Sequence, residues 1–284
     1  MNLKKIVFDN YKEVDRIYRT LDRKKIRRTK NIRLIPDIDY RIGGKVSYAE
    51  WAHVIGIFQT LIYQSVSKKL GNNILDIGCG TGLIGIASES FTFNGGSYTG
   101  IDVSKADIDF SKSQYPHQNY KFIHLDTYNA TYANKQSPTI TPWPVDSNSI
   151  DLVTALSVWT HFKEEDAFFY LKEVDRTLQK GGKAIITLFL LDQFYQEAML
   201  KMNAKSRFHF TDRTRFIFDQ SAYGSEHWFC PSWVAHPEDA IGLTSIGFER
   251  LLSAVNLKLV AYHPGCWKEL PGIYMQDIII LEKV

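Results

Sequence analysis

Short apolar runs alternate with stretches of helical spacing along most of the chain after residue 71. Strands that alternate with helices are typical of parallel sheets joined by right-handed crossovers, so the pattern predicts an α/β fold. The expected strands lie near residues 73–77, 98–102, 120–125, 150–156, 183–190, 257–262 and 276–282. The expected helices lie near residues 82–90, 104–114, 163–179 and 238–252.

Further elements frame this alternation at both ends. The residues from Ser47 to Glu50 match a capping box, and apolar side chains recur at helical spacing from Trp51 to Val66. This predicts a helix that begins after Ser47 and ends before Gly71. At the other end, no helical pattern separates the last two strands. We therefore expect these two strands to form an antiparallel pair at one edge of the sheet.

Residues 192–237 interrupt the alternation with an aromatic-rich insertion that includes Trp228 and Trp233. A connection of this length inside a compact domain is usually functional. It leaves the carboxyl end of a strand, which is the edge where open α/β sheets bind ligands. We therefore expect a lid or substrate-binding segment whose tryptophans stack on the ligand. The alternative is an extra packing module without ligand contact.

The N-terminal segment is strongly basic. Residues 1–45 contain 14 Lys or Arg against 6 Asp or Glu, although the net charge of the whole chain is only +3. Such a run could meet nucleic acid, an anionic membrane or an anionic substrate. Alternatively, it is the solvated face of a helix with Ile17, Leu21 and Ile26 as a thin apolar seam beneath it. We expect a basic arm over residues 1–46, joined by a Gly-Gly hinge to a body over residues 47–284.

Composition narrows the class of protein. Hydrophobic residues make up 44% and charged residues 23% of the chain, as in ordinary globular domains. No apolar run approaches the roughly 20 residues that cross a bilayer, and the N-terminus turns polar too early for a signal peptide. The cysteines Cys79, Cys230 and Cys266 match neither a disulfide framework nor a metal-binding pattern. We therefore expect a cytoplasmic protein.

A glycine-rich turn follows the first expected strand. The run from Ile74 to Gly85 reads as a strand, a turn with glycines at alternate positions, and the start of a helix. Its last part also satisfies the dinucleotide fingerprint, but that pattern alone is weak. Asp76 ends the strand beside the ligand site, where a carboxylate would repel a pyrophosphate and attract an ammonium or sulfonium group. The motif therefore favours a cationic ligand over NAD.

A second acid, Asp102, ends the next expected strand, about 20 residues beyond the glycines. A carboxylate at this place can accept hydrogen bonds from both hydroxyls of a ribose. The alternative role for an aspartate at a strand end is to cap the following helix. Together with the glycine turn, the ribose role is the one that we expect.

These features resemble a known family. The stretches 74–85, 149–156 and 178–187, together with Asp102 and Asp126, are similar to those of class I S-adenosylmethionine-dependent methyltransferases. The resemblance implies a Rossmann-like, mostly parallel sheet of seven strands with an antiparallel last strand. It also implies the residues that hold S-adenosylmethionine: Asp76, Gly78, Cys79 and Gly80 at the methionine and ribose, Asp102 at the ribose, Asp126 and Thr127 at the adenine, and Leu156 closing the site.

His161 follows the expected fourth strand, where small-molecule and sugar O-methyltransferases carry a histidine. An alcohol is a poor nucleophile while protonated, so its methylation calls for a general base. The ordinary pKa of histidine, near 6.5, suits that role. The alternative is a structural histidine that orients the loop or caps the next helix.

The segment from Ala155 to Phe162 also bears on the acceptor. It lacks the proline motif of methylases that act on amino groups of bases, a nucleophilic cysteine, and the carboxylate cluster that a hard cation needs. The resemblance therefore implies metal-independent transfer to an oxygen of a small-molecule or glycan-like acceptor. Trp267, in a late loop similar to that of glycan-pathway methyltransferases, could stack on a sugar ring.

Two other functions stay open at this point. The basic arm could serve a nucleic-acid methyltransferase, although the fourth-strand segment makes nucleic acid an unlikely partner. The chain could instead be a non-catalytic module that binds S-adenosylmethionine. The intact glycine turn and both acids favour an enzyme. The sequence does not indicate the oligomeric state.

Overall fold

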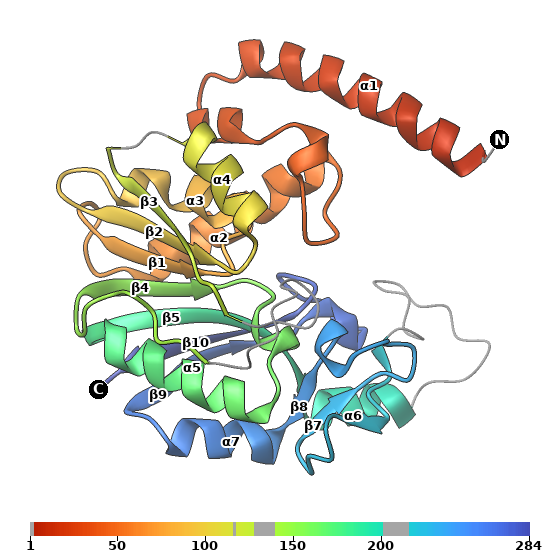
Figure 1. Cartoon of the computed structure of the whole chain (residues 1–284), viewed down its shortest axis with the longest axis vertical. Helices are drawn as coiled ribbons and strands as arrows, with labels where there is room; N and C mark the ends of the chain where they lie inside the picture. The colour runs from red at the N-terminus through yellow and green to blue at the C-terminus, as the bar shows by residue number, and fades with distance from the viewer. Residues whose placement is uncertain (1–2, 116–117, 128–139, 201–215) are drawn as a thin grey trace.

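A mostly parallel sheet forms the centre of the computed structural model, which describes residues 3–115, 118–127, 140–200 and 216–284 (Figure 1). β10 pairs in antiparallel fashion with both β5 and β9, whereas the pairs among β1 to β5 are parallel. This confirms the expected seven-stranded sheet with an antiparallel last strand. In sheet order, the strands are β3 (Tyr120–His124), β2 (Ser97–Asp102), β1 (Asn73–Ile77), β4 (Ile150–Ala155), β5 (Leu178–Leu191), β10 (Asp277–Lys283) and β9 (Leu257–His263).

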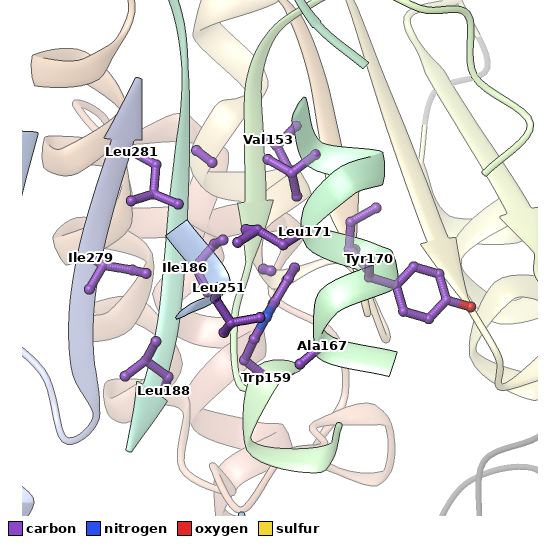
Figure 2. Packing of buried hydrophobic residues seen from close by; sticks show 14 of the residues in the cluster. Val153, Trp159, Ala167, Tyr170, Leu171, Ile186, Leu188, Leu251, Ile279 and Leu281 are labelled. Atoms are coloured by element: carbon purple, nitrogen blue, oxygen red, sulfur yellow. The ribbon is translucent and has the colours of Figure 1, made fainter. Parts of the chain in front are cut away.

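Helices cover both faces of the sheet, because its central strands are apolar on both sides. Ile74 packs with the cluster beneath α2 and α3, whereas its neighbour Leu75 packs with the cluster beneath α5 and α7. This two-sided burial is typical of parallel sheets. Figure 2 shows the second cluster, in which Leu171 of α5 and Leu251 of α7 lie against Ile186 of β5. The helices are α2 (Tyr48–Ser65), α3 (Leu83–Ser88), α4 (Lys105–Gln114), α5 (Glu164–Thr177) and α7 (Ser245–Ser253).

Some expected element boundaries were wrong. The helix expected over 238–252 begins only at Ser245, because Thr244 caps it by accepting a hydrogen bond from the Gly247 amide at 3.1 Å. β5 begins at Leu178, earlier than expected. α2 ends at Ser65, so the basic residues after it lie outside the helix. The short 3-10 helices in the body are η3 (Glu89–Phe91), η4 (Trp159–His161), η6 (Pro237–Asp239) and η7 (Cys266–Lys268).

The described part of the insertion extends the sheet at the carboxyl end of β5. It contains α6 (Gln193–Leu200), β6 (Gln220–Ser221) and β7 (Trp228–Cys230). β7 pairs with β8 (Gly242–Thr244), which runs parallel to the end of β5. Residues 201–215 of the insertion lie outside the described residues.

The N-terminal segment consists of α1 (Leu3–Lys25), η1 (Lys30–Leu34) and η2 (Ile38–Tyr40). In Figure 1, α1 lies apart from the sheet, whereas the residues after it return to the body. Ile35 is fully buried in the cluster with α2 and α3, and Thr81 donates a hydrogen bond to the Tyr40 carbonyl at 2.7 Å. The apolar seam considered as an alternative is not formed, since Ile17 and Leu21 are exposed and only Ile26 of the three is buried.

Candidate active site

A cavity of about 420 Å³ opens at the carboxyl ends of β1, β2 and β4. This volume lies within the usual range for small-molecule sites, and the position is the ligand-binding edge of a Rossmann-like sheet. Most of the residues expected at the cofactor, and the expected base, line this cavity. They are Asp76, Gly78, Cys79, Gly80, Asp102, Thr127, Leu156 and His161.

Asp126 is the exception among the expected cofactor residues. It is exposed and does not line the cavity, whereas its neighbours Leu125 and Thr127 do. Any hydrogen bond to a bound adenine from this loop would therefore come more directly from Thr127.

The glycine turn brings the backbone close to its neighbours. Gly78 and Gly80 have φ angles of +64° and +50°, a region that side-chain-bearing residues rarely adopt. A Cβ at Gly78 would lie 2.5 Å from Val158, and a Cβ at Gly80 would lie 2.6 Å from Ile42. The turn thus needs glycine for its conformation and for the narrow space beside the cavity.

Asp102 joins the glycine turn to the end of β2. Its carboxylate accepts hydrogen bonds from the Gly80 amide at 2.7 Å and the Ser104 amide at 2.8 Å. Burial raises the pKa of the Asp102 carboxyl, and these backbone bonds oppose the rise. Each carboxylate oxygen has a second lone pair, so the group can also accept hydroxyl donors from the cavity.

Asp76 is almost fully buried at the end of β1. Its carboxyl group accepts hydrogen bonds from the Tyr98 hydroxyl at 2.6 Å and the Thr154 hydroxyl at 2.8 Å. Burial raises the pKa of the Asp76 carboxyl to about 7, although both hydrogen bonds act in the opposite direction. A cation in the cavity would favour the ionised form and stabilise it further.

His161 lies in η4, directly after β4. Its Nδ1 atom is 2.6 Å from the backbone carbonyl oxygen of Glu238. A carbonyl can only accept, so Nδ1 carries a proton and the lone pair of the neutral ring is on Nε2. Burial lowers the pKa of the His161 imidazole below its ordinary value, despite the opposing effect of the Glu238 carbonyl. The ring is therefore mostly neutral at pH 7 and able to accept a proton.

The N-terminal segment supplies part of the cavity wall, which sequence reasoning missed. Ile42, Gly43 and Lys45 line the cavity, and Ile42 lies beside Gly80 of the glycine turn. Burial lowers the pKa of the Lys45 ammonium, and its Nζ atom donates to the Gly43 carbonyl at 2.9 Å. The adjacent glycines at 43 and 44 indicated a hinge, but nothing in the local pattern could show which surface the hinge approaches.

Aromatic side chains form another part of the wall. Trp143 stacks on Tyr170 with ring centres 5.5 Å apart, and Phe162 stacks on the same ring at 4.9 Å. All three residues line the cavity, on the side that also holds Val158 and His161. Trp143 and Tyr170 are 2% and 5% exposed, so this part of the wall is a packed apolar cluster in which Phe162 is the most accessible ring.

The tryptophans expected to contact an acceptor do not line the cavity. Trp228 and Trp267 are each 1% exposed, which leaves no ring face open for stacking. Trp267 packs against Phe189 and Phe218, and its Nε1 atom donates to Asp277 at 3.0 Å. These two assignments were therefore wrong: both rings belong to the core. Trp233 is 44% exposed but lies outside the cavity wall.

No group of three or more His, Cys, Asp or Glu side chains in the described ranges is arranged to hold a metal ion. None of the helices in those ranges is long and apolar enough to span a membrane.

Comparisons with known proteins agree with this geometry. A family model described as "Methyltransferase domain" matches residues 75–186, which include the glycine turn and strands β1 to β4. Residues 75–186 of this chain therefore match a methyltransferase domain, and the chain has the fold of a SAM-dependent methyltransferase of known structure. Ubiquinone biosynthesis O-methyltransferase of Coxiella burnetii is 23% identical to this methyltransferase over 203 residues, which cover 72% of each protein.

Solved structures share the fold of this methyltransferase. A SAM-dependent methyltransferase from Methanosarcina mazei aligns with a TM-score of 0.51 at 18% identity, covering 79% of this chain and 97% of that one. Geranyl diphosphate C-methyltransferase from Streptomyces coelicolor, solved with Mg²⁺, geranyl diphosphate and S-adenosyl-L-homocysteine, aligns with a TM-score of 0.50 at 11% identity. That alignment covers 91% of this chain and 86% of the other.

The cofactor of this methyltransferase is S-adenosylmethionine, and the cavity fits it chemically. The glycine turn leaves space where any Cβ would intrude. Two carboxyl groups, Asp76 and Asp102, line the cavity, and their charge suits a ligand that carries ammonium, sulfonium and ribose hydroxyl groups.

Proposed function

We propose that this methyltransferase acts on a hydroxyl group of a small acceptor, with His161 as the general base. The observation that carries the proposal is the 2.6 Å contact between His161 Nδ1 and the Glu238 carbonyl, in a ring that lines the cofactor cavity. That contact fixes the tautomer in which Nε2 can accept the proton of an alcohol or phenol. The name of the Coxiella burnetii relative, an O-methyltransferase, supports the same acceptor atom.

The cofactor would be held by the residues around the glycine turn. Asp102 would accept the ribose hydroxyls while it keeps its bond to the Gly80 amide. Asp76 would balance the positive charge of the methionine part. Lys45, which also lines the cavity, would complement the charge of a carboxylate. When bound, S-adenosylmethionine supplies an electrophilic methyl group on a sulfonium, and a neutral thioether leaves.

The chain's own contribution is to position the acceptor and remove its proton. His161 would take the hydroxyl proton as the acceptor oxygen forms its bond to the methyl group. The apolar wall of Trp143, Phe162 and Tyr170 would exclude water, with the partly exposed Phe162 ring next to the acceptor. A small acceptor with a hydroxyl on a planar ring fits these surroundings.

The alternative acceptors have less support. A glycan acceptor was expected mainly because of three tryptophans, of which Trp228 and Trp267 are buried in the core. A nucleic-acid acceptor was suggested by the basic N-terminal segment. However, Lys12 and Arg16 of that segment pair with Asp39 at 2.5 Å, so these two cations are engaged within the protein.

The proposal is tested by an acceptor screen with the purified protein and S-adenosylmethionine. The panel contains monohydric phenols, catechols and quinols, each matched to the analogue in which a methyl ether or hydrogen replaces the hydroxyl. We expect product with a mass gain of one methylene only from hydroxyl-bearing members. His53→Ala, which removes an exposed histidine of α2, serves as the matched control for His161→Ala. Product from the analogues without a hydroxyl would instead indicate a carbon or nitrogen acceptor.

A further inference from the structure

The first helix turns its apolar side away from the body. Tyr11, Val14, Ile17, Tyr18 and Leu21 of α1 are exposed by 40%, 64%, 61%, 55% and 58%. They recur at spacings of three and four residues, so they form one stripe along the helix. We call these five residues the α1 stripe. Exposed apolar patches of this kind usually mark an interaction site.

The orientation of this helix is fixed by charges on its opposite side. Lys12 and Arg16 each lie 2.5 Å from Asp39, and Asp15 forms a buried ion pair with Arg41 at 2.8 Å. The polar side of α1 thus packs on the body, and the α1 stripe faces outward. Rotating the helix to bury the stripe would break all three ion pairs. Within the described residues, only Tyr18 of the stripe has a ring contact with the body, an edge contact to Tyr48 at 5.8 Å.

The spacing within the stripe suits another helix. Positions 11, 14, 18 and 21 follow the 3-4-3 pattern of a two-helix seam, in which each apolar side chain fits between those of the facing helix. They are also symmetric about residue 16, since 11 and 21, and likewise 14 and 18, are equally distant from it. An antiparallel pair of identical α1 helices crossing at the level of residue 16 would therefore match each of these four residues with another of the four.

The charged residues beside the stripe also favour an antiparallel pair of α1 helices. Asp9 and Lys24 are exposed and lie 15 residues, about four helical turns, apart on one flank of the stripe. In an antiparallel pair, the flank of one helix meets the same flank of the other, with its ends reversed. Asp9 of each copy would then lie next to Lys24 of the other copy.

We propose that the α1 stripe binds the α1 stripe of a second copy of this chain, in an antiparallel pair related by a twofold axis. A self-complementary patch of this kind is what a twofold dimer requires. The inference does not depend on the acceptor or on the role of His161.

Sedimentation velocity over a range of concentrations tests the pairing with the full-length protein. We expect the original protein to form a dimer. Val14→Glu combined with Leu21→Glu should raise the dissociation constant of this dimer at least about a hundredfold, so that the variant is a monomer. Val260→Glu is the matched control, because Val260 is 42% exposed on β9, outside the stripe. Melting temperature and affinity for S-adenosylmethionine, measured on the same samples, establish that each variant is folded.

A charge reversal tests the antiparallel order. Asp9→Lys alone and Lys24→Asp alone should each weaken self-association about tenfold. Each single variant brings two like charges together at both of the symmetry-related contacts between residues 9 and 24. The double variant should recover the original affinity, because the two charges are then exchanged. A monomer at all concentrations would overturn the proposal. So would a dimer unaffected by the glutamate substitutions, a double variant without recovery, or stripe-dependent binding of the monomer to vesicles of anionic lipid.

Discussion

Asp15 of α1 and Arg41 form a buried ion pair, with 2.8 Å between their charged groups and side-chain exposures of 4% and 0%. Arg41 also donates hydrogen bonds to the backbone carbonyls of Pro36 and Val46, at 3.1 and 3.0 Å. The pair therefore joins the first helix to the segment that supplies Ile42 and Lys45 to the cavity wall. Asp15 does not line the cavity itself, but through Arg41 it helps to hold the segment that forms part of the cavity wall.

Asp15→Ala should destabilise the fold and weaken cofactor binding together. It would leave the Arg41 cation buried without its partner, a change that typically costs about 3–5 kcal/mol. Ile42 and Lys45, the wall residues next to Arg41, would no longer be held by the ion pair to α1. Affinity for S-adenosylmethionine should therefore fall as well. Thermal unfolding and calorimetric titration measure the two effects. Asp9→Ala, an exposed acid of the same helix, is the control, and equal melting temperatures for both variants would contradict the role of the ion pair.

Asp102→Ala should weaken the binding of S-adenosylmethionine by about 1.5–3 kcal/mol, the usual contribution of a hydrogen bond to a charged group. Gly80→Val should weaken it more, since the φ of +50° and the 2.6 Å approach to Ile42 leave no space for a branched side chain. Titration calorimetry gives both affinities. Asp109→Ala, an exposed acid on α4, should bind like the original protein. Unchanged affinity in both site variants would mean that the cofactor lies elsewhere.

Much of the fold followed from the sequence because the signals are local. Runs of consecutive apolar residues indicate strands that are buried on both faces. The glycines at 78 and 80 indicate a turn that needs positive φ angles. The placement of Asp76, Asp102 and His161 at one cavity then follows from parallel topology, since the carboxyl ends of parallel strands share one edge.

The errors concern contacts between segments distant in sequence. Trp267 is buried because Phe189 and Phe218 pack around it, and an aromatic residue in a loop has the same local pattern whether it lines a ligand or fills a core. The apolar side of α1 was expected to face inward. It faces outward because Asp39, far along the chain, pairs with the basic side of the helix.

Cofactor affinity should depend on pH through Asp76. Its pKa of about 7 means that the carboxyl is mostly protonated at lower pH, where it cannot balance a cationic ligand. Affinity for S-adenosylmethionine should therefore rise by up to about tenfold per pH unit below 7 and level off above it. Asp76→Asn should flatten this dependence. A pH-independent affinity in the unmodified protein would show that Asp76 does not respond to the ligand's charge.

Asp76 should also affect stability with the opposite dependence on pH. Between its ordinary pKa of 3.8 and about 7, the folded protein holds a proton that the unfolded chain has lost. The free energy of unfolding therefore contains a contribution that falls as pH rises through this range and is constant above it. Comparing the cofactor-free protein with Asp76→Asn by denaturant titration at several pH values isolates this contribution, which should be missing from the variant.

Methyl transfer should not require a divalent metal. The described residues contain no cluster of three or more potential ligands, and the segment after β4 presents Ser157 and His161 to the cavity in place of carboxylates. Activity should therefore survive excess chelator and should not increase when Mg²⁺ is added. Loss of activity with the chelator, restored by Mg²⁺, would point to an acceptor or a site of a different class.

His161→Ala should lower kcat by about 10²–10⁴-fold, the usual contribution of a general base, if the acceptor is a hydroxyl. Affinity for S-adenosylmethionine should change little, because the proposed role concerns the acceptor proton. In the unmodified enzyme, kcat should rise with pH through a pKa below the ordinary 6.5 and stay level above it, since burial keeps the His161 ring neutral to lower pH. The variant should lose that inflection, and the His53→Ala control should retain it. A variant with full kcat from about pH 6 to 9 would leave His161 a structural role, in which its bond to the Glu238 carbonyl orients the loop after β4.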